Sequence, residues 1–206
     1  MAKKNARNTR GKIVEAAWQL FYEQGYEDTT VEEIIESSHT SKGSFYHYFD
    51  GKDALLSTLS DLFDQKYLAL QEAMDPAMPA MDKLLFLNRA LFRMIENSVS
   101  MDLLARLLST QLVTNGERHL LDHKRIYYRL LRRIIAEGQA AGQLSQGRSV
   151  NDMVKVYALC ERALLSDWCL CGGEYPLCDY AARQMPHLLC SFLPPSSSKH
   201  GSGENP

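Results

Sequence analysis

The stretch TVEEIIESSHTSKGSFYHYFDGKDAL, residues 30–55, decides the fold of this chain. Thr30 and Glu33 fit a capping box, in which the threonine hydroxyl accepts a bond from the amide three residues on and the glutamate accepts one from the threonine amide. A short helix is therefore predicted to begin at Val31. Residues 38–40, Ser-His-Thr, interrupt it, and a second short helix is predicted over about residues 41–49.

Two short helices joined by a turn of about four residues describe a helix-turn-helix, whose second helix enters the major groove of DNA. Phe45 and Phe49 lie four apart and are expected to hold that helix from inside. The outward residues are small or polar, so the backbone can approach base edges, while hydroxyl and lysine groups can contact phosphates. Base contacts are assigned to Lys42, Gly43, Ser44 and His47, and phosphate contacts to Thr30, Tyr46, Tyr48 and Lys52; the predicted DNA face also includes Thr40 and Ser41. An ordinary aromatic surface is the alternative for the tyrosines and His47.

An amphipathic helix is predicted before this motif, from about Thr9. Its apolar residues recur at helical spacing, and Gly25 ends it because glycine accepts the left-handed C-cap conformation. Residues 1–9 form a basic arm that can follow the DNA backbone or a minor groove. The arm residues considered are Lys3, Lys4 and Arg7, with Arg10 just behind them. A solvated tail is the alternative.

The rest of the chain also has helical periodicity and no strand pattern, so the fold class is all-α. A helix is predicted from about Asp50-Gly51 to Met74, followed by a loop between Pro76 and Pro79. Further helices are predicted at about 81–97, 101–113, 117–141, 150–171 and 175–193. Pro186 is expected to kink the last of these. The predicted domains are a DNA-binding domain at 1–56 and a helical regulatory and dimerisation domain at 57–193, with a disordered tail at 194–206.

Composition fits an ordinary globular chain. It has 206 residues, a formal net charge of −2, 45% hydrophobic and 23% charged residues. No run reaches the roughly 18 apolar residues of a membrane span, and the basic N-terminus has no apolar stretch behind it, so we expect a cytoplasmic protein without membrane contact. The five cysteines are odd in number and clustered in the last quarter, which indicates reduced thiols.

Residues 10–56 closely resemble the signature of TetR-family transcriptional regulators. The resemblance is carried by SKGSFYHYF at residues 41–49, followed by Lys52, Asp53 and Leu55. It implies a three-helix DNA-binding domain, a helix linking it to a larger helical domain, a homodimer on pseudo-palindromic operator DNA, and repression relieved by a small-molecule effector. Ser38, His39 and Thr40 depart from the family pattern in the turn, and Ile35 replaces a usual alanine. Histidine tolerates the left-handed backbone that the turn needs better than most residues, so the turn is expected to survive with some strain.

The regulatory half is expected to carry the dimer interface and an effector pocket. The last two predicted helices have apolar stripes, and in the resembling family such helices form a four-helix interface. The predicted interface residues are Met153, Leu164, Leu165, Leu177, Ala181, Leu188, Leu189 and Phe192. Aromatic, leucine and methionine side chains make adaptable cavities. The predicted effector-binding residues are Phe86, Phe92, Met101, Leu104, Tyr127, Tyr128, Tyr157 and Trp168. An intrachain core is the alternative for both sets.

Two other functions are weighed against a ligand-responsive repressor. The first is a DNA-binding activator or a regulator without a ligand. The second is an all-α metal enzyme that uses His119 and His123, four apart on a predicted helix. The sequence has no glycine-rich phosphate loop, no nucleophile elbow and no third ligand for these histidines, so we expect no enzyme, no metal and no cofactor. Cys160, Cys169, Cys171 and Cys178 are read as small buried apolar residues rather than as redox sensors.

Overall fold

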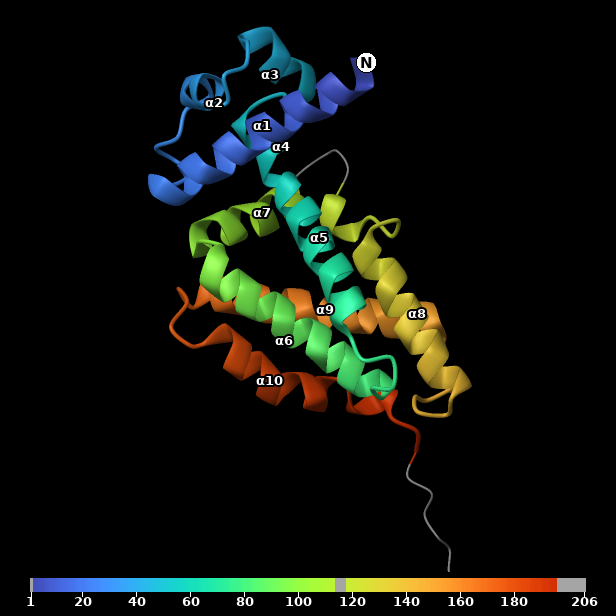
Figure 1. Cartoon of the computed structure of the whole chain (residues 1–206). Helices are drawn as coiled ribbons and strands as arrows, with labels where there is room; N and C mark the ends of the chain where they lie inside the picture. The colour runs from blue at the N-terminus through green and yellow to red at the C-terminus, as the bar shows by residue number, and fades with distance from the viewer. Residues whose placement is uncertain (1, 114–117, 196–206) are drawn as a thin grey trace, which may run out of the picture.

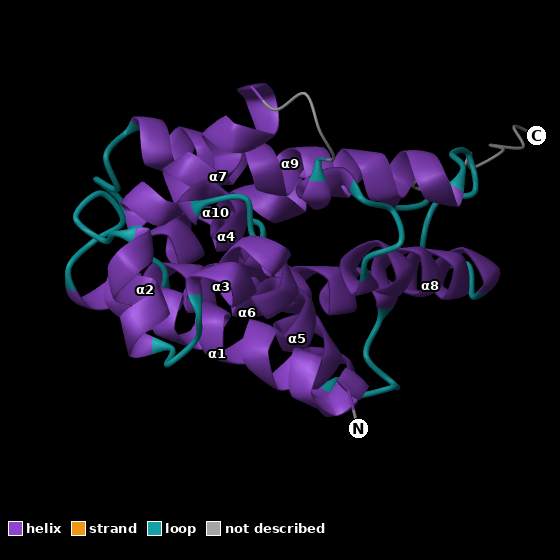
Figure 2. Ribbon diagram, turned by 90° about the horizontal axis from the view of Figure 1, so that it is seen from above, coloured by secondary structure: helices purple, strands orange, loops and turns teal. Residues whose placement is uncertain are grey.

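The computed structural model describes residues 2–113 and 118–195, and the side chains from Thr9 onward, except those of 114–117. Its described part is helical, with no strand (Figure 2). The N-terminal unit contains α1 (Ala2–Glu23), α2 (Val31–Ser37), α3 (Lys42–Tyr48) and α4 (Lys52–Leu56). It is followed by α5 (Thr58–Ala73), α6 (Ala80–Ser98), α7 (Met101–Val113), the 3₁₀ turn His119–Leu121, α8 (Ile126–Ala140), α9 (Val150–Leu170), α10 (Leu177–Leu188) and a final 3₁₀ turn, Cys190–Phe192.

The N-terminal unit packs around α1, which contacts both α2 and α3. Ile13, Phe21, Ile34 and Phe45 are each almost completely buried in one continuous core. Figure 1 shows this unit lying across one end of the bundle formed by α5 to α10. As predicted, Gly25 follows α1 in a left-handed conformation, with φ of 90°.

The larger unit is a bundle in which α6 packs against α10, α8 and α5, and α9 packs against α8, α7 and α10. In the view of Figure 1, helix α9 runs behind α5 and α6. Its buried side chains include Met153, Tyr157, Glu161 and Leu165, which recur every four residues along one face. None of the helices in the described part of the chain is long and apolar enough to cross a membrane.

Three predicted boundaries were wrong. The first helix begins at Ala2 rather than near Thr9, so the backbone of the predicted arm belongs to α1, while the side chains of Lys3, Lys4 and Arg7 lie outside the described residues. The helix predicted over 117–141 begins only at Ile126. The last helix ends at Leu188, two residues after Pro186, and a 3₁₀ turn follows. Of the predicted tail, residues 196–206 lie outside the described part.

The predicted helix from residue 50 to 74 is divided at Ser57 into α4 and α5. Three hydroxyl groups around this point donate to backbone carbonyls three residues earlier: Ser57 to Ala54, Thr58 to Leu55 and Ser60 to Ser57, at 2.6–2.7 Å. Such side-chain bonds compete with the helical ladder and bend helices. The periodic apolar pattern alone gave no sign of this division.

Candidate nucleic-acid interface and ligand cavity

Helix α3 has one buried face and one face open to solvent. Phe45 is fully buried and Phe49 is 5% exposed, with ring centroids 5.9 Å apart. On the other face the side chains of Lys42, Gly43, Tyr46 and His47 are exposed, and those of Ser44 and Tyr48 are half-buried. The division into inner and outer residues is the one that the sequence predicted. The outer face presents small and polar groups in the arrangement that a major groove can accept.

The start of α3 is fixed by Ser41, whose Oγ accepts from the Ser44 amide at 3.1 Å. Gly43 lies in the first turn, and a Cβ placed on it would meet no atom closer than the Ser41 Oγ at 4.0 Å. The fold of this chain therefore does not require a glycine at position 43. A glycine that the protein's own packing does not need is consistent with close approach of the backbone to an external surface.

The turn between α2 and α3 adopts the strained conformation that its sequence predicted. His39 has φ of 52°, the one non-glycine residue with positive φ in the described part of the chain. The Ser38 and Thr40 hydroxyls are 2.8 Å apart and hydrogen-bond to each other, and Ser38 Oγ also donates to the Ile35 carbonyl. These polar residues supply local hydrogen bonds that hold the turn.

The capping box at α2 is confirmed. Glu33 Oε2 accepts from the Thr30 amide at 2.7 Å and from the Thr30 hydroxyl at 2.8 Å, while the Glu33 amide donates to that hydroxyl. The bond from the Thr30 amide is the main reason that the pKa of Glu33 is lowered. A phosphate at Thr30 would have to displace this carboxylate, so the structure uses Thr30 as a cap and does not leave it open as an anion site.

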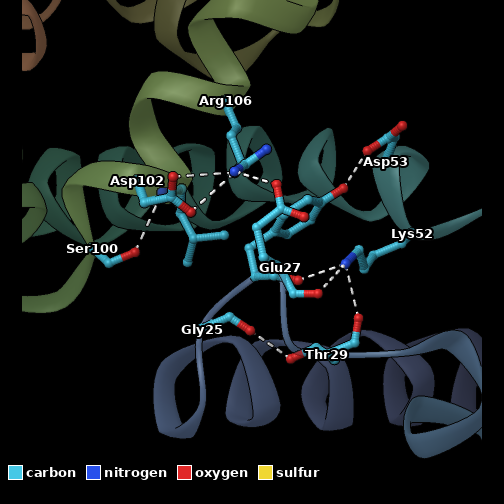
Figure 3. A network of polar contacts seen from close by, with 10 residues as sticks. Gly25, Glu27, Thr29, Lys52, Asp53, Ser100, Asp102 and Arg106 are labelled. Atoms are coloured by element: carbon cyan, nitrogen blue, oxygen red, sulfur yellow. Dashed lines mark hydrogen bonds and ion pairs between the residues drawn. The ribbon is translucent and has the colours of Figure 1, made fainter.

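The predicted phosphate contact of Lys52 needs correction. Its Nζ donates to the carbonyl oxygens of Tyr26 at 2.6 Å, Glu27 at 3.2 Å and Thr29 at 2.8 Å (Figure 3). It also lies 4.4 Å from the centroid of the Tyr26 ring. An ammonium group has three hydrogens, and three carbonyls accept them. Lys52 thus ties α4 to the loop between α1 and α2, and its charge points into the protein.

The two units meet at Arg106 of α7. Figure 3 shows its guanidinium reaching from α7 toward the loop that follows α1. It forms ion pairs with Glu27 of that loop and, at 3.0 Å, with Asp102 of its own helix, and it lies 5.0 Å from the Tyr26 ring centroid. The Tyr26 hydroxyl in turn donates to Asp53 of α4. Burial and the Asp53 carboxylate both raise the pKa of Tyr26, so it remains a donor.

A small cavity lies inside the bundle, between α5, α6, α7, α8 and α9. Its volume is about 60 Å³, and among its lining residues are Tyr67, Leu107, Glu161 and Leu165. Of the predicted effector-binding residues, Leu104 and Tyr127 line this cavity. Leu104 and Leu107 belong to α7, the helix that also carries Arg106. The cavity and the contact between the two units therefore share one helix.

The other predicted effector-binding residues lie elsewhere. Phe86 lines a separate surface pocket between α6 and α10, and Phe92 is fully buried in the core. The Tyr128 and Tyr157 hydroxyls donate to the carbonyls of Leu120 and Leu84. Trp168 Nε1 donates to the Tyr175 carbonyl, and the sulfur of Met101 lies near Trp168 and Gly173. The alternative of an intrachain core thus describes most of this set.

The predicted dimer residues also need correction. Met153, Leu177, Ala181, Leu189 and Phe192 are fully buried within the chain, and Leu164 and Leu165 are each 7% exposed. Leu188 is exposed at 44%. The stripe of α9 that the sequence assigned to a partner is instead buried within the chain, where α9 packs against α7, α8 and α10. A different set, on the outer faces of the same helices, is exposed: Leu159 at 56% and Leu170 at 86% on α9.

The histidine pair of the enzyme hypothesis does not share a helix. His119 begins a 3₁₀ turn and His123 lies in the loop before α8. Within the described ranges no group of three or more His, Cys, Asp and Glu could hold a metal ion. The cysteines vary in exposure: Cys178 is buried, Cys160 and Cys169 are half-buried, and Cys171 is exposed, against the expectation for this last residue.

Sequence reasoning missed the residues that give the cavity its polar character, Tyr67 and Glu161. Glu161 lies on the apolar face of α9 and is 4% exposed. A glutamate at a helical core position was the available signal, because carboxylates are rarely buried fully without partners. Arg106 was also missed, since nothing in the local pattern of α7 distinguishes it from an ordinary surface arginine.

The model of the family "Bacterial regulatory proteins, tetR family" matches residues 13–59. An uncharacterized HTH-type transcriptional regulator of Lactococcus lactis subsp. lactis is 43% identical over 58 residues, which are 28% of this chain and 30% of the relative. The HTH-type transcriptional repressor KstR2 of Mycolicibacterium smegmatis is 32% identical over 89 residues, 43% of each chain. The matched stretch therefore spans less than half the length of these curated relatives.

Solved structures resemble nearly the whole chain. Thermus thermophilus FadR, a TetR-family transcriptional repressor in complex with lauroyl-CoA, aligns with a TM-score of 0.73 and 23% identity, over 89% of this chain and 95% of that one. The regulator FadR of Bacillus subtilis, in complex with stearoyl-CoA, aligns with a TM-score of 0.67 and 19% identity, over 89% and 99%. At these identities the likeness shows a common fold, which includes the helical domain beyond residue 59.

Proposed function

We propose that this chain, whose residues 13–59 match the model of the tetR family of bacterial regulatory proteins, is a dimeric repressor of that family, which binds operator DNA and releases it when a small effector binds. The observation that carries the proposal is the outer face of α3. It is polar and open to solvent, while Phe45 and Phe49 hold the helix from behind. We assign base contacts to Lys42, Gly43, Ser44 and His47, and phosphate contacts to Tyr46 and Tyr48.

Selection of DNA from a random duplex pool by the purified protein tests this proposal. An enriched inverted repeat, with half-sites about one helical turn apart, is expected for a two-fold dimer. Tyr46→Phe is expected to weaken binding to the selected duplex, because it removes one hydroxyl from the outer face. Tyr22→Phe is the matched control, since Tyr22 is 77% exposed on α1 and lines a pocket with Ser100 and Leu103 of the larger unit. Absence of enrichment at low salt would refute the DNA-binding assignment.

For the dimer, we assign the exposed stripe of α9 together with the outer face of α10. Leu159, Ala163, Ser166 and Leu170 recur at spacings of four, three and four, which places them along one side of the helix. Leu188 of α10 is exposed as well. Leu159→Glu is expected to give a monomer in light scattering after size-exclusion chromatography. Leu112→Glu, at an 81% exposed leucine of α7, is expected to remain a dimer. If both variants remained dimers, the exposed stripe of α9 would not be part of the dimer interface.

For the effector, we assign the cavity between α5 and α9. Its walls include residues of α7, the helix that contacts the DNA-binding unit through Arg106. At about 60 Å³ the cavity is far smaller than the usual few hundred Å³ of a ligand pocket, so binding requires the helices around it to move apart. That movement is the link that we propose between effector binding and DNA release.

An activator, or a regulator without an effector, is the second candidate function. A reporter gene behind the selected operator distinguishes them: deletion of the regulator raises expression for a repressor and lowers it for an activator. Location in the cytoplasm and the absence of an enzymatic activity stay predictions.

A further inference from the structure

The cavity contains polar groups, although most of its wall is apolar. Phe63, Leu91, Leu107 and Leu165 form much of the wall. Glu161 of α9 lies at the cavity with its side chain almost completely buried. An ionisable carboxyl group in such a place is costly unless it is paired, so its partners indicate what the site is built to hold.

Neutral groups donate hydrogen bonds to Glu161. Asn88 Nδ2 donates to its Oε1 at 2.9 Å, and the Tyr127 hydroxyl donates to its Oε2 at 2.7 Å. Burial is the main reason that the pKa of Glu161 is raised, and the charge of Arg162, which lines the same cavity, partly offsets this rise. Within the described ranges Glu161 forms no ion pair with a lysine, arginine or histidine. The site therefore contains a buried acid on which the charge of Arg162 acts, but which forms no ion pair with a cation of the described residues.

Tyr67 of α5 provides an unsatisfied polar atom in the same cavity. Tyr67 lines the cavity, is 2% exposed, and its hydroxyl has no hydrogen-bond partner among the described residues. Its ring centroid lies 5.1 Å from that of Tyr127, whose hydroxyl is bonded to Glu161. Buried polar atoms are nearly always bonded in native proteins, so an exception next to a cavity indicates a missing partner.

The two arginines that line the cavity are engaged with the protein itself. The Arg125 guanidinium pairs with Asp64 at 2.8 Å and donates to the Ser60 carbonyl at 2.8 Å. Burial raises the pKa of both Tyr128 and Glu161, and the charge of Arg162 acts in the opposite direction on each of them. The groups that can still accept a hydrogen bond from a ligand are thus the Glu161 carboxylate, which has hydrogen bonds but no ion pair, and the unbonded Tyr67 oxygen.

We propose that the effector of this cavity is an apolar molecule with one cationic nitrogen, whose N–H groups bond to Glu161 and to the Tyr67 hydroxyl. An ammonium supplies the missing counter-charge and several donors at once. The faces of the Tyr67 and Tyr127 rings also favour a cation over a neutral group. The proposal deepens the proposed function, because it rests on the assignment of this cavity to the effector.

Three probes of the same skeleton test the proposal: 2-phenylethylamine, 2-phenylethanol and 3-phenylpropionate. Their binding to the full chain is measured by titration calorimetry. The amine is expected to bind at least tenfold more tightly than the alcohol, and the carboxylate most weakly. Equal affinities, tighter binding of the carboxylate, or no binding of any probe at millimolar concentration would overturn the proposal. Tighter binding of the carboxylate would instead indicate that Arg125 and Arg162 recognise the ligand.

Substitutions of cavity residues test whether the preference for the amine arises at Glu161 and Tyr67. Glu161→Gln is expected to reduce the preference for the amine to less than threefold, whereas Glu72→Gln, at an exposed glutamate of α5, is expected to leave it unchanged. Should Glu161→Gln fail to fold, Tyr67→Phe provides the test, because its hydroxyl makes no bond within the described protein. Tyr67→Phe is expected to weaken amine binding several-fold and to leave binding of the alcohol nearly unchanged. An amine preference that survives both substitutions would refute the assignment.

The same samples distinguish this proposal from the proposed function. Amine binding that depends on Glu161, without release of the selected DNA, would keep the ligand class and refute coupling to DNA. Specific DNA binding together with no amine preference would keep the DNA-binding function and refute the ligand class.

Discussion

Replacement of Lys52 by methionine is expected to destabilise the protein without altering the salt dependence of DNA binding. Methionine keeps much of the apolar stem and removes the ammonium that three carbonyls accept from. At partly exposed carbonyls each bond contributes about 1 kcal/mol net, and the position over the Tyr26 ring adds about 0.5–1 kcal/mol. The expected loss is therefore about 3–4 kcal/mol. For a chain of this size each kcal/mol lowers the Tm by about 2–4 °C, so a fall of about 6–16 °C is expected.

Thermal unfolding followed by circular dichroism gives the stability, and fluorescence anisotropy on the selected duplex between about 50 and 200 mM salt gives the salt slope. A phosphate contact contributes about 0.9 to the slope of log K against log salt. Lys42→Met is the matched control: Lys42 is 70% exposed, so its removal is expected to weaken DNA binding and to change stability by less than about 0.5 kcal/mol. If Lys52→Met lowered the slope by about 0.9 per protomer and left the Tm unchanged, Lys52 would be a phosphate contact and the reasoning from its carbonyl partners would be wrong.

Four further predictions concern Gly43, His39, the ion pair of Arg106 with Glu27, and Glu161. Gly43→Ala is expected to stabilise folding by up to about 1 kcal/mol in thermal melting, because alanine favours the helix and its methyl group meets no close atom of the protein. It is expected to weaken DNA binding at least tenfold in anisotropy, because the methyl group would meet the DNA. Unchanged DNA affinity would show that α3 does not enter the groove. His39→Gly is expected to gain about 0.5–1 kcal/mol in urea unfolding, because it relieves the left-handed strain, and a loss of stability would contradict that strain. A double-mutant cycle of Arg106→Met and Glu27→Gln should give a coupling of about 0.2–1 kcal/mol, the range for a largely exposed ion pair, and a coupling of zero would argue against this contact. Burial raises the pKa of Glu161 in the folded state. The contribution of Glu161 to folding stability is therefore complete below the unfolded pKa of about 4.3 and is lost as pH rises through the folded pKa. In urea titrations across that range, Glu161→Gln should lose less stability with rising pH than the parent, and parallel curves would show that Glu161 is not buried.

The local design of the DNA-binding unit could be predicted from the sequence because it depends on short-range interactions. The capping box of Thr30 and Glu33 joins residues three apart, and the inward face of α3 is set by Phe45 and Phe49, four apart. The left-handed turn at His39 was expected from the resemblance to the TetR family, whose pattern usually has a glycine at this position. Each of these features uses atoms within one or two turns of a helix, and periodicity and capping rules describe that range.

The hydrogen-bond partners of the charged side chains could not be predicted from periodicity or capping rules. Lys52 looks like a free cation in the sequence, but its three carbonyl partners lie 23 to 26 residues away. Glu161 accepts from Asn88 and Tyr127, 73 and 34 residues away, and none of the three looks unusual in its own segment. Which groups meet depends on how α4, α6, α8 and α9 pack, and no local pattern contains that information.

By itself, the sequence determined that the chain is helical, that a helix-turn-helix lies near its N-terminus and which side of α3 faces outward. The tertiary structure decided which apolar stripe of α9 is core and which is surface. The periodicity of the sequence shows that a helix has an apolar face. Helix α9 has a buried face, with Met153 and Leu165, and an exposed face, with Leu159 and Leu170. Leucines occur on both faces, and only the positions of α7, α8 and α10 around the helix determine which face water and a partner chain can reach.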